Sequence, residues 1–166
     1  STTTALAVGD AFAVALLERK GFTKEDFAKS HPGGSLGKQL LLSIGDIMHT
    51  GEEIPVVCSD DSLSTGLIEM SQKALGMTAV VDKDNQLAGI FTDGDLRRTL
   101  ESNIDIKATK MSDVMTANPF VLSEDTLAYN AVNLIQEKKI TSVIVTKENK
   151  VIGALNIHDL FRAGLM

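Results

Sequence analysis

The chain of 166 residues is 43% hydrophobic and 23% charged, a composition that fits an ordinary globular domain and excludes a disordered chain. Its 16 Lys and Arg residues against 22 acidic residues give a net charge of -6, and no window concentrates basic side chains. A nucleic-acid partner is therefore not expected. Cys58 is the single cysteine, so no disulfide can form within the chain, and we expect a cytoplasmic location.

The N-terminal stretch predicts a helix. Residues 2–4 are threonines that can cap a helix running to about Lys20, and Gly21 supplies a left-handed residue that ends it. The apolar run of residues 5–17 contains Asp10 and is too short to span a bilayer, so no membrane partner is expected.

Two more helices are expected before the central part of the chain. Thr23 to Asp26 has capping-box spacing and begins a short helix, and another helix is expected from about Leu36 to Asp46-Ile47-Met48. Because this region has helices but no strand, it cannot be a complete α/β domain. The chain opens on Ser1 rather than Met, and we expect it to be a piece of a larger protein.

The strongest signal is an internal repeat at an offset of 64 residues. Thirteen of the 47 positions from 55 to 101 carry the same residue 64 positions later, whereas ordinary composition predicts about three. The identical pairs are Pro55/Pro119, Val57/Val121, Ser59/Ser123, Asp61/Asp125, Leu63/Leu127, Gln72/Gln136, Val81/Val145, Lys83/Lys147, Asn85/Asn149, Gly89/Gly153, Asp95/Asp159, Leu96/Leu160 and Arg98/Arg162. The repeat therefore indicates a duplicated structural unit.

Each copy predicts an extended segment, a helix, two strands and a closing helix. Ser62 or Asp61 can cap the first of these helices. Apolar side chains recur at helical spacing in both copies, as Leu63, Leu67 and Met70 in the first and as Leu127, Ala131 and Leu134 in the second. Segments rich in Val and Ile predict strands at 78–81 and 87–92, and again at 142–145 and 151–156.

The repeat resembles the CBS domain, the family named after cystathionine beta-synthase. Asp46-Ile47-Met48 recurs as Asp113-Val114-Met115, and the stretch from Gly89 to Leu96 closes the first copy. The resemblance implies an α/β (α+β) fold in which a tandem CBS pair forms a disc with pseudo-two-fold symmetry and ligand clefts between the copies. We expect CBS domains at residues 45–104 and 105–166.

The segment before the repeat resembles the junction between the sugar-isomerase domain and the CBS pair in arabinose 5-phosphate isomerases. The matching residues are Gly9-Asp10-Ala11, Ser30-His31-Pro32-Gly33-Gly34 and Leu36-Gly37-Lys38. The resemblance implies that residues 1–44 are the helical end of that domain with its linker. It also implies a parent enzyme that interconverts D-ribulose 5-phosphate and D-arabinose 5-phosphate for Kdo, lipopolysaccharide or capsule synthesis.

His31 is the residue that this resemblance places at the catalytic chemistry. Imidazole can give or take a proton near neutral pH, although a histidine beside Pro-Gly-Gly can equally be a solvated loop residue. A lone His31 has no phosphate cradle and no acid-base partner, so we expect this chain by itself to be inactive.

The strand end at Thr92 and the helix start at Asp95 predict a nucleotide site. Thr92 can donate its hydroxyl to a phosphate, and Asp95 can accept two ribose hydroxyls. The alternative is that these two residues are a helix cap and its reciprocal partner. In the second copy Asn156 and Asp159 take the same places, but the change from Thr to Asn makes this cleft the weaker candidate.

Thr78 and Ser142 hold matching places near the start of a strand, where they can contact a base or ribose or be simple strand-end hydroxyls. His31, His49 and His158 have no ligand-like spacing, so no metal site and no required cofactor are expected.

Three functions remain open. The first is a regulatory CBS pair that senses an adenine or cytidine nucleotide, or the nucleotide sugar CMP-Kdo. The second is a structural module with vestigial clefts that holds an oligomer together, and the third is an enzyme in its own right. Self-association as a dimer of this chain and a tetramer of the parent is expected, through the spare apolar positions Ile68, Leu75, Val132 and Ile135.

Overall fold

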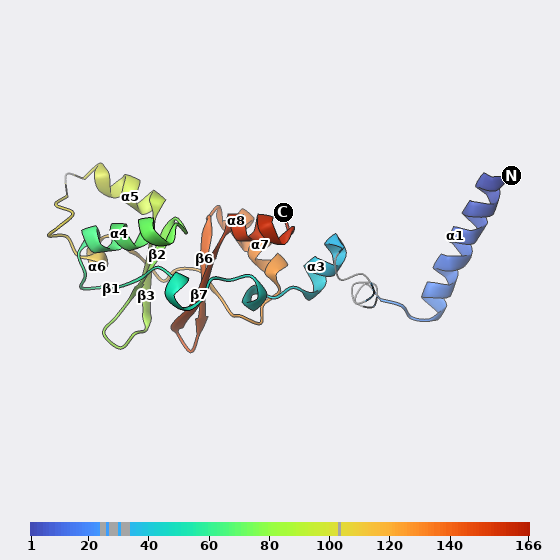
Figure 1. The fold of residues 1–166 in the computed structure, drawn as a ribbon, viewed down its shortest axis with the longest axis horizontal. Helices are drawn as coiled ribbons and strands as arrows, with labels where there is room; N and C mark the ends of the chain where they lie inside the picture. The colour runs from blue at the N-terminus through green and yellow to red at the C-terminus, as the bar shows by residue number, and fades with distance from the viewer. Residues whose placement is uncertain (24–25, 27–29, 31–33, 103) are drawn as a thin grey trace. The chain divides into compact units, whose positions relative to one another are not determined.

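The computed structural model describes residues 1–23, 26, 30, 34–102 and 104–166, and these divide into two compact units, residues 1–41 and residues 42–166 (Figure 1). His31 lies outside the described residues, as does most of the short helix expected after Thr23.

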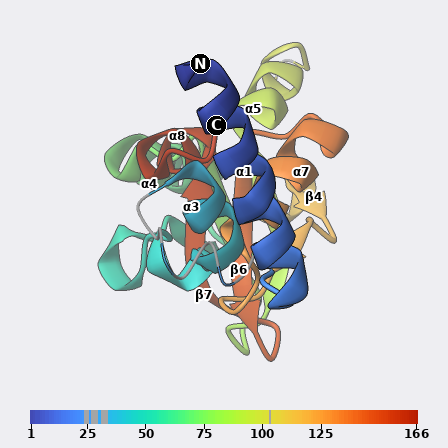
Figure 2. The same ribbon diagram turned by 90° about the vertical axis from the view of Figure 1, so that its right-hand side faces the viewer.

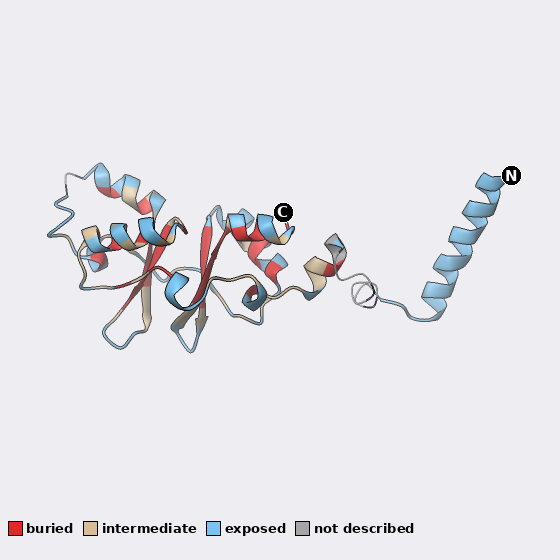
Figure 3. Ribbon diagram, in the orientation of Figure 1, coloured by how far each residue is buried: buried red, intermediate tan, exposed pale blue. Residues whose placement is uncertain are grey.

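The N-terminal unit contains α1 (Thr2–Arg19) and α3 (Ser35–Leu41). Gly21 follows α1 with a φ of 63°, which confirms the expected left-handed residue. The helix has no buried residue, although Leu6 and Phe12 lie on it, and Figure 3 shows it exposed along its whole length. The capping-box spacing is also confirmed, because the Thr23 backbone N–H and hydroxyl both donate to the Asp26 carboxylate, and the Asp26 N–H donates back to the Thr23 hydroxyl.

The expected helix from Leu36 to Met48 is shorter than predicted. It ends at Leu41, and Ile44–Asp46 form a single 3-10 turn, η1. Ser43 is extended, and both its N–H and its hydroxyl donate to the Asp46 carboxylate, at 2.8 and 2.7 Å. Because the Ile44 N–H donates instead to the carbonyl of Thr126 in the second repeat, a tertiary contact replaces the helical hydrogen bond.

The C-terminal unit holds the two repeats. The first contains β1 (Val56–Cys58), α4 (Leu63–Lys73), β2 (Met77–Val81), β3 (Leu87–Thr92) and α5 (Asp93–Leu100). The second contains β5 (Val121–Leu122), α7 (Ala128–Lys138), β6 (Ser142–Lys147), β7 (Lys150–Asn156) and α8 (Ile157–Ala163). The short elements η2 (Gly51–Glu53), α6 (Met111–Val114) and β4 (Thr116–Ala117) lie in the connecting segments.

Each repeat builds one small mixed sheet. In the first, β1 runs parallel to β2 and β2 runs antiparallel to β3; in the second, β5, β6 and β7 repeat this arrangement. An apolar cluster that includes Met77, Ile90, Ile144 and Ala154 joins the two sheets. In both views the tips of the β2–β3 and β6–β7 hairpins lie at one end of the strands, and α5 and α8 lie at the other (Figures 1 and 2). Thr92 and Asn156 therefore both lie at the helical end.

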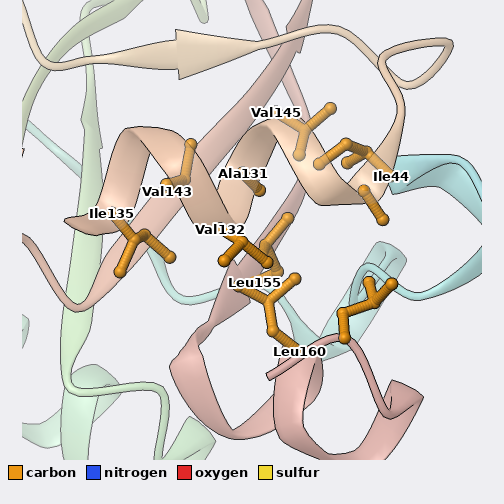
Figure 4. Packing of buried hydrophobic residues seen from close by; sticks show 10 residues of the cluster. Ile44, Ala131, Val132, Ile135, Val143, Val145, Leu155 and Leu160 are labelled. Carbon is orange, nitrogen blue, oxygen red and sulfur yellow. The ribbon is translucent and has the colours of Figure 1, made fainter. Parts of the chain in front are cut away.

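The segment that precedes each repeat packs into the core of the other repeat. Ile44, ahead of the first repeat, is completely buried among Ala131, Val145 and Leu155 of the second (Figure 4). Met111, ahead of the second repeat, is completely buried in the core of the first. The two repeats thus exchange their leading segments, and neither hydrophobic core is complete without the other copy.

Two glycines make room for this exchange. A Cβ at Gly89 would lie 2.6 Å from the Met115 sulfur and 2.9 Å from the Thr116 carbonyl oxygen. A Cβ at Gly153 would clash with the Met48 sulfur and lie 3.2 Å from the carbonyl oxygen of His49. The repeated glycine is therefore explained by the close approach of the other copy's Asp-x-Met segment.

The apolar stripe predicted for the second helix is confirmed at Ala131 and Leu134, which pack in the core, and is wrong at Leu127. The buried side of α7 is formed by Ala128, Ala131, Val132 and Ile135, whereas Leu127 precedes the helix and is 37% exposed. The cause is a local shift of register between the copies: Ala128, not Leu127, takes the place of Leu63. The Ala128 N–H donates to Leu42, just as the Leu63 N–H donates to Thr109. In the first helix the stripe is confirmed, and Ser62 is the cap, accepting from the Thr65 N–H.

The residues expected at a self-association surface are mostly internal. Leu75, Val132 and Ile135 are each at most 5% exposed, because they complete the cores of the C-terminal unit. Ile68 alone of the four is exposed, at 56%. The surface proposed from these four positions is therefore wrong for three of them.

We expect Gly89→Ala to destabilise the chain by about 1 to 3 kcal/mol, because the Thr116 backbone cannot move away without breaking the β3–β4 pairing. Urea unfolding measures the change. Gly94→Ala is the matched control: its Cβ would lie no closer than 3.5 Å to any atom, and alanine favours the helix there. Equal stability of Gly89→Ala and the wild type would contradict the close approach.

Candidate functional site

A cleft of about 470 Å³ lies between the two repeats at the helical end of the sheets. Three segments line it: the junction of β3 and α5, the stretch from β4 towards β5, and the junction of α7 and β6. Its polar lining consists of Thr92, Asp93, Asp95, Arg97, Arg98, Thr116, Asn118, Lys139, Thr141 and Ser142. Both repeats therefore contribute to one site.

Asp95 is the centre of the hydrogen bonding in this cleft. One carboxylate oxygen, Oδ2, accepts from the Thr92 backbone N–H at 2.8 Å and from the Thr92 hydroxyl at 2.7 Å. The other, Oδ1, accepts from the Thr116 hydroxyl at 2.9 Å and from the Arg98 guanidinium. Burial works to raise the pKa of Asp95, but the hydrogen bonds from Thr92, Thr116 and Arg98 outweigh it and hold the pKa below its usual value.

The capping interpretation of this motif is confirmed. Thr92 is the N-cap of α5, and its side chain and that of Asp95 form a reciprocal capping box. This does not remove the ligand role, because the same atoms border the cleft. That role remains a prediction.

Cationic and aromatic side chains surround the rest of the cleft. Arg97 and Arg98 come from α5, and Lys139 comes from the end of α7, where it has a left-handed backbone with a φ of 54°. The half-exposed Phe120 forms another part of the wall, and the Lys138 ammonium lies 5.4 Å from the centre of its ring. The cleft can therefore bind an anion through its cationic side chains and stack a flat ring on Phe120 at the same time.

The second repeat builds the counterpart of this network. Asn156 caps α8, and the Asp159 carboxylate accepts from the Asn156 backbone N–H at 2.7 Å and from Arg162. In place of Thr116, His49 contacts the aspartate: its Nε2 lies 3.0 Å from Asp159 Oδ1, and its Nδ1 lies 3.0 Å from Glu53. The carboxylate is thus held from both sides.

The surroundings of the two motifs differ. Asn118, which borders the first cleft, is the residue before Pro119. The residue before the matching Pro55 is Ile54, an apolar side chain that is buried between the sheets. Lys139, the left-handed residue that ends α7, is matched at the end of α4 by Ala74, which carries no charge. Two smaller cavities of about 440 and 380 Å³ border Asn156 and Asp159 respectively, in place of one continuous cleft.

The structure places Ser142 and Thr78 differently. Ser142 is buried, donates its hydroxyl to the Leu75 carbonyl at 3.0 Å, and lines both the large cleft and the cavity beside Asn156. Thr78 is completely buried, donates to the Gly66 carbonyl at 3.3 Å, and lines neither. Of the predicted residues, the structure brings Thr92, Asp95 and Ser142 together at one cleft.

Sequence reasoning missed Thr116, His49 and Lys139. A signal for the first two was available, because Asp46-Ile47-Met48 and Asp113-Val114-Met115 are each followed by one of them. Aligning these motifs, 67 residues apart, pairs His49 with Thr116. Lys139 has no such signal, since only the fold brings the end of α7 to the end of β3.

The part of the chain that the structure describes contains no group of three or more His, Cys, Asp or Glu side chains suited to hold a metal ion. Within the same residues, no helix is both long enough and apolar enough to cross a membrane.

The comparisons identify the family. A model described as the CBS domain matches residues 44–102 and 111–165, and the chain belongs to the CBS domain family, with two copies of the domain. The chain is 49% identical to "Arabinose 5-phosphate isomerase KdsD" of Yersinia pestis and 50% identical to the protein of that name in Escherichia coli strain K12. These matches cover 100% of this chain and 51% of each relative, so the chain spans about half the length of the curated relatives it matches.

Solved structures share the fold of the C-terminal unit. CBSX2 in complex with AMP matches with a TM-score of 0.63 and 27% identity, covering 75% of this chain and 96% of that one. A putative acetoin utilization protein, AcuB, from Vibrio cholerae matches with a TM-score of 0.67 and 18% identity, covering 76% and 92%. The second match supports the fold alone.

The lowered pKa of Asp95 predicts how stability depends on pH. Because this pKa lies below the ordinary value of 3.8, the ionised carboxylate stabilises the folded state. That contribution is complete above the unfolded pKa and is lost as the pH falls through the folded pKa. We expect Asp95→Asn to be less stable than the wild type at neutral pH, with a gap that narrows below about pH 4. Urea unfolding between pH 3 and 7 measures this, and a gap that does not change with pH would contradict it.

Proposed function

We propose that residues 42–166 are a regulatory module that binds one nucleotide in the cleft at Thr92 and Asp95. The observation that carries the proposal is the cleft itself, which places a buried carboxylate opposite cationic side chains from both repeats. Its volume of about 470 Å³ fits a small-molecule site. The similar structure of CBSX2 in complex with AMP supports a nucleotide as the ligand class.

Each part of a nucleotide has a chemical partner in the cleft. Asp95 offers acceptors to ribose hydroxyls, and Thr92 with Arg97, Arg98 and Lys139 offers donors to a phosphate. Phe120 offers an aromatic face to the base. An adenine nucleotide, a cytidine nucleotide or CMP-Kdo each carries these groups.

We further propose that the chain belongs to an arabinose 5-phosphate isomerase that supplies Kdo synthesis, with the CBS pair reporting ligand levels to the catalytic domain. The names of the relatives at about 50% identity support this. In this proposal residues 1–44 are the end of the sugar-isomerase domain and its linker. The exposed apolar side chains of α1, such as Leu6 and Phe12, suit a helix that packs inside a larger domain.

Self-association is retained as an expectation, because exposed apolar side chains such as Ile68 and Phe161 lie on the helices of the C-terminal unit. A cytoplasmic location also remains an expectation. The structural alternative, with vestigial clefts, predicts association without nucleotide binding.

Calorimetric titration of the chain with AMP, ATP, CMP and CMP-Kdo tests the binding site. We expect one ligand per chain for the nucleotide that binds, and a loss of at least about tenfold in affinity in Asp95→Ala, because charge-assisted hydrogen bonds are removed. Asp159→Ala is the matched control and is expected to bind like the wild type. Loss of binding in Asp159→Ala with retention in Asp95→Ala would place the ligand in the other repeat.

The catalytic proposal has its own test. The chain of 166 residues is expected to show no conversion of ribulose 5-phosphate above background, because it brings no phosphate cradle to His31. In the longer enzyme we expect His31→Ala to lower turnover by about 100-fold or more, the usual effect of removing an acid-base group. Near-normal turnover of that variant would return His31 to the role of a solvated loop residue.

A further inference from the structure

The Asp95 carboxylate has no acceptor site left in this structure. A carboxylate offers about four lone-pair sites, and Asp95 receives four donors: the Thr92 N–H, the Thr92 hydroxyl, the Thr116 hydroxyl and Arg98. A ribose diol needs one or two of these sites. The proposed ligand therefore has to displace a donor that the protein itself provides.

Arg98 is the donor that can leave. Thr92 is fixed by the capping box, and Thr116 is fixed because its strand pairs with Ile90 of β3. Arg98 reaches Asp95 from the solvent side, and its side chain is 69% exposed against 6% for that of Asp95. Most of the Arg98 side chain lies in water, so its guanidinium can move away while Thr92 and Thr116 still hold the buried carboxylate.

A displaced Arg98 remains in the same cleft. Arg98 lines the cavity together with Arg97 and Lys139, and neither of these has a carboxylate partner among the ion pairs of the described residues. An anion that enters beside the ribose would meet all three cations. An uncharged ligand would also displace Arg98 from Asp95, but it carries no phosphate to which the guanidinium could then bind.

We propose that Arg98 makes the cleft selective for a phosphorylated ribonucleoside over the free nucleoside, by exchanging its contact with Asp95 for one with the phosphate. The proposal rests on the nucleotide site proposed above and adds the chemical class that the site accepts. Arg98 acts as a competitor for the ribose and as a ligand of the phosphate, so the two parts of the ligand are recognised together.

The effect of removing Arg98 separates this role from a purely structural one. Without the guanidinium an acceptor site on Asp95 is free, so nucleoside binding should strengthen by about two- to fivefold. The phosphate loses a charge-assisted hydrogen bond, so nucleotide binding should weaken by about tenfold or more. A structural role would change both affinities in the same direction.

The experiment is calorimetric titration of adenosine and AMP, and of cytidine and CMP, into wild type, Arg98→Ala and Arg162→Ala. Arg162 makes the same contact with Asp159 in the other repeat, so Arg162→Ala is the matched control and should behave as the wild type. Thermal unfolding checks that each variant is folded, and Arg98→Gln repeats the test if Arg98→Ala is not.

The expected result is opposite shifts for nucleoside and nucleotide in the Arg98 variant alone. Equal weakening of both ligands, or no change in either, would overturn the role of Arg98 while leaving the nucleotide site in place. Absence of binding of all four ligands to the wild type would contradict the nucleotide site, and with it this inference.

Discussion

Each repeat is completed by the segment that precedes the other one, and the rest of the C-terminal unit depends on this exchange. Ile44 and Met111 each fill the core of the opposite copy. Further along the same two segments, Met48 and Met115 pass so close to a strand that it can carry no side chain there, and the sequence has Gly153 and Gly89 at these points. A pair of sheets that are individually small thereby becomes one cooperative unit, because neither copy can bury its own apolar surface alone.

The same crossing builds the candidate site. The chain that follows Met115 runs along β3 as β4 and delivers Thr116 to Asp95; the chain that follows Met48 delivers His49 to Asp159. The aspartate of each capping box, a common local motif, thus contacts a side chain from a distant part of the sequence. Differences between the two crossing segments then make the two motifs unequal, since one aspartate meets a hydroxyl and the other an imidazole.

Local features of the fold could be predicted from the sequence, and features set by long-range contacts could not. The strand pairs, the capping box at Thr92 and the first helical stripe follow from patterns within a few residues. The helix after Leu36 was predicted too long, because the hydrogen bonds of Ile44 go to a partner that is distant in sequence. The stripe of α7 was wrong at Leu127, because an ungapped alignment hides a one-residue shift that runs from the first strand of each repeat through the helix to the second strand and ends before the third. Lys139 could not be assigned to the cleft before the fold was known.

We propose that the exchange of leading segments creates a single ligand cleft at Asp95. Backbone amide NMR of the chain during titration with AMP and CMP tests it most directly, since each amide reports its own surroundings. We expect ligand-dependent shifts at residues from three separate parts of the sequence, with little change at Asn156 and Asp159. The residues expected to shift are Thr92, Asp95, Thr116 and Lys139. Shifts confined to residues 156–162, or shifts at α5 without any at Thr116 and Lys139, would contradict it.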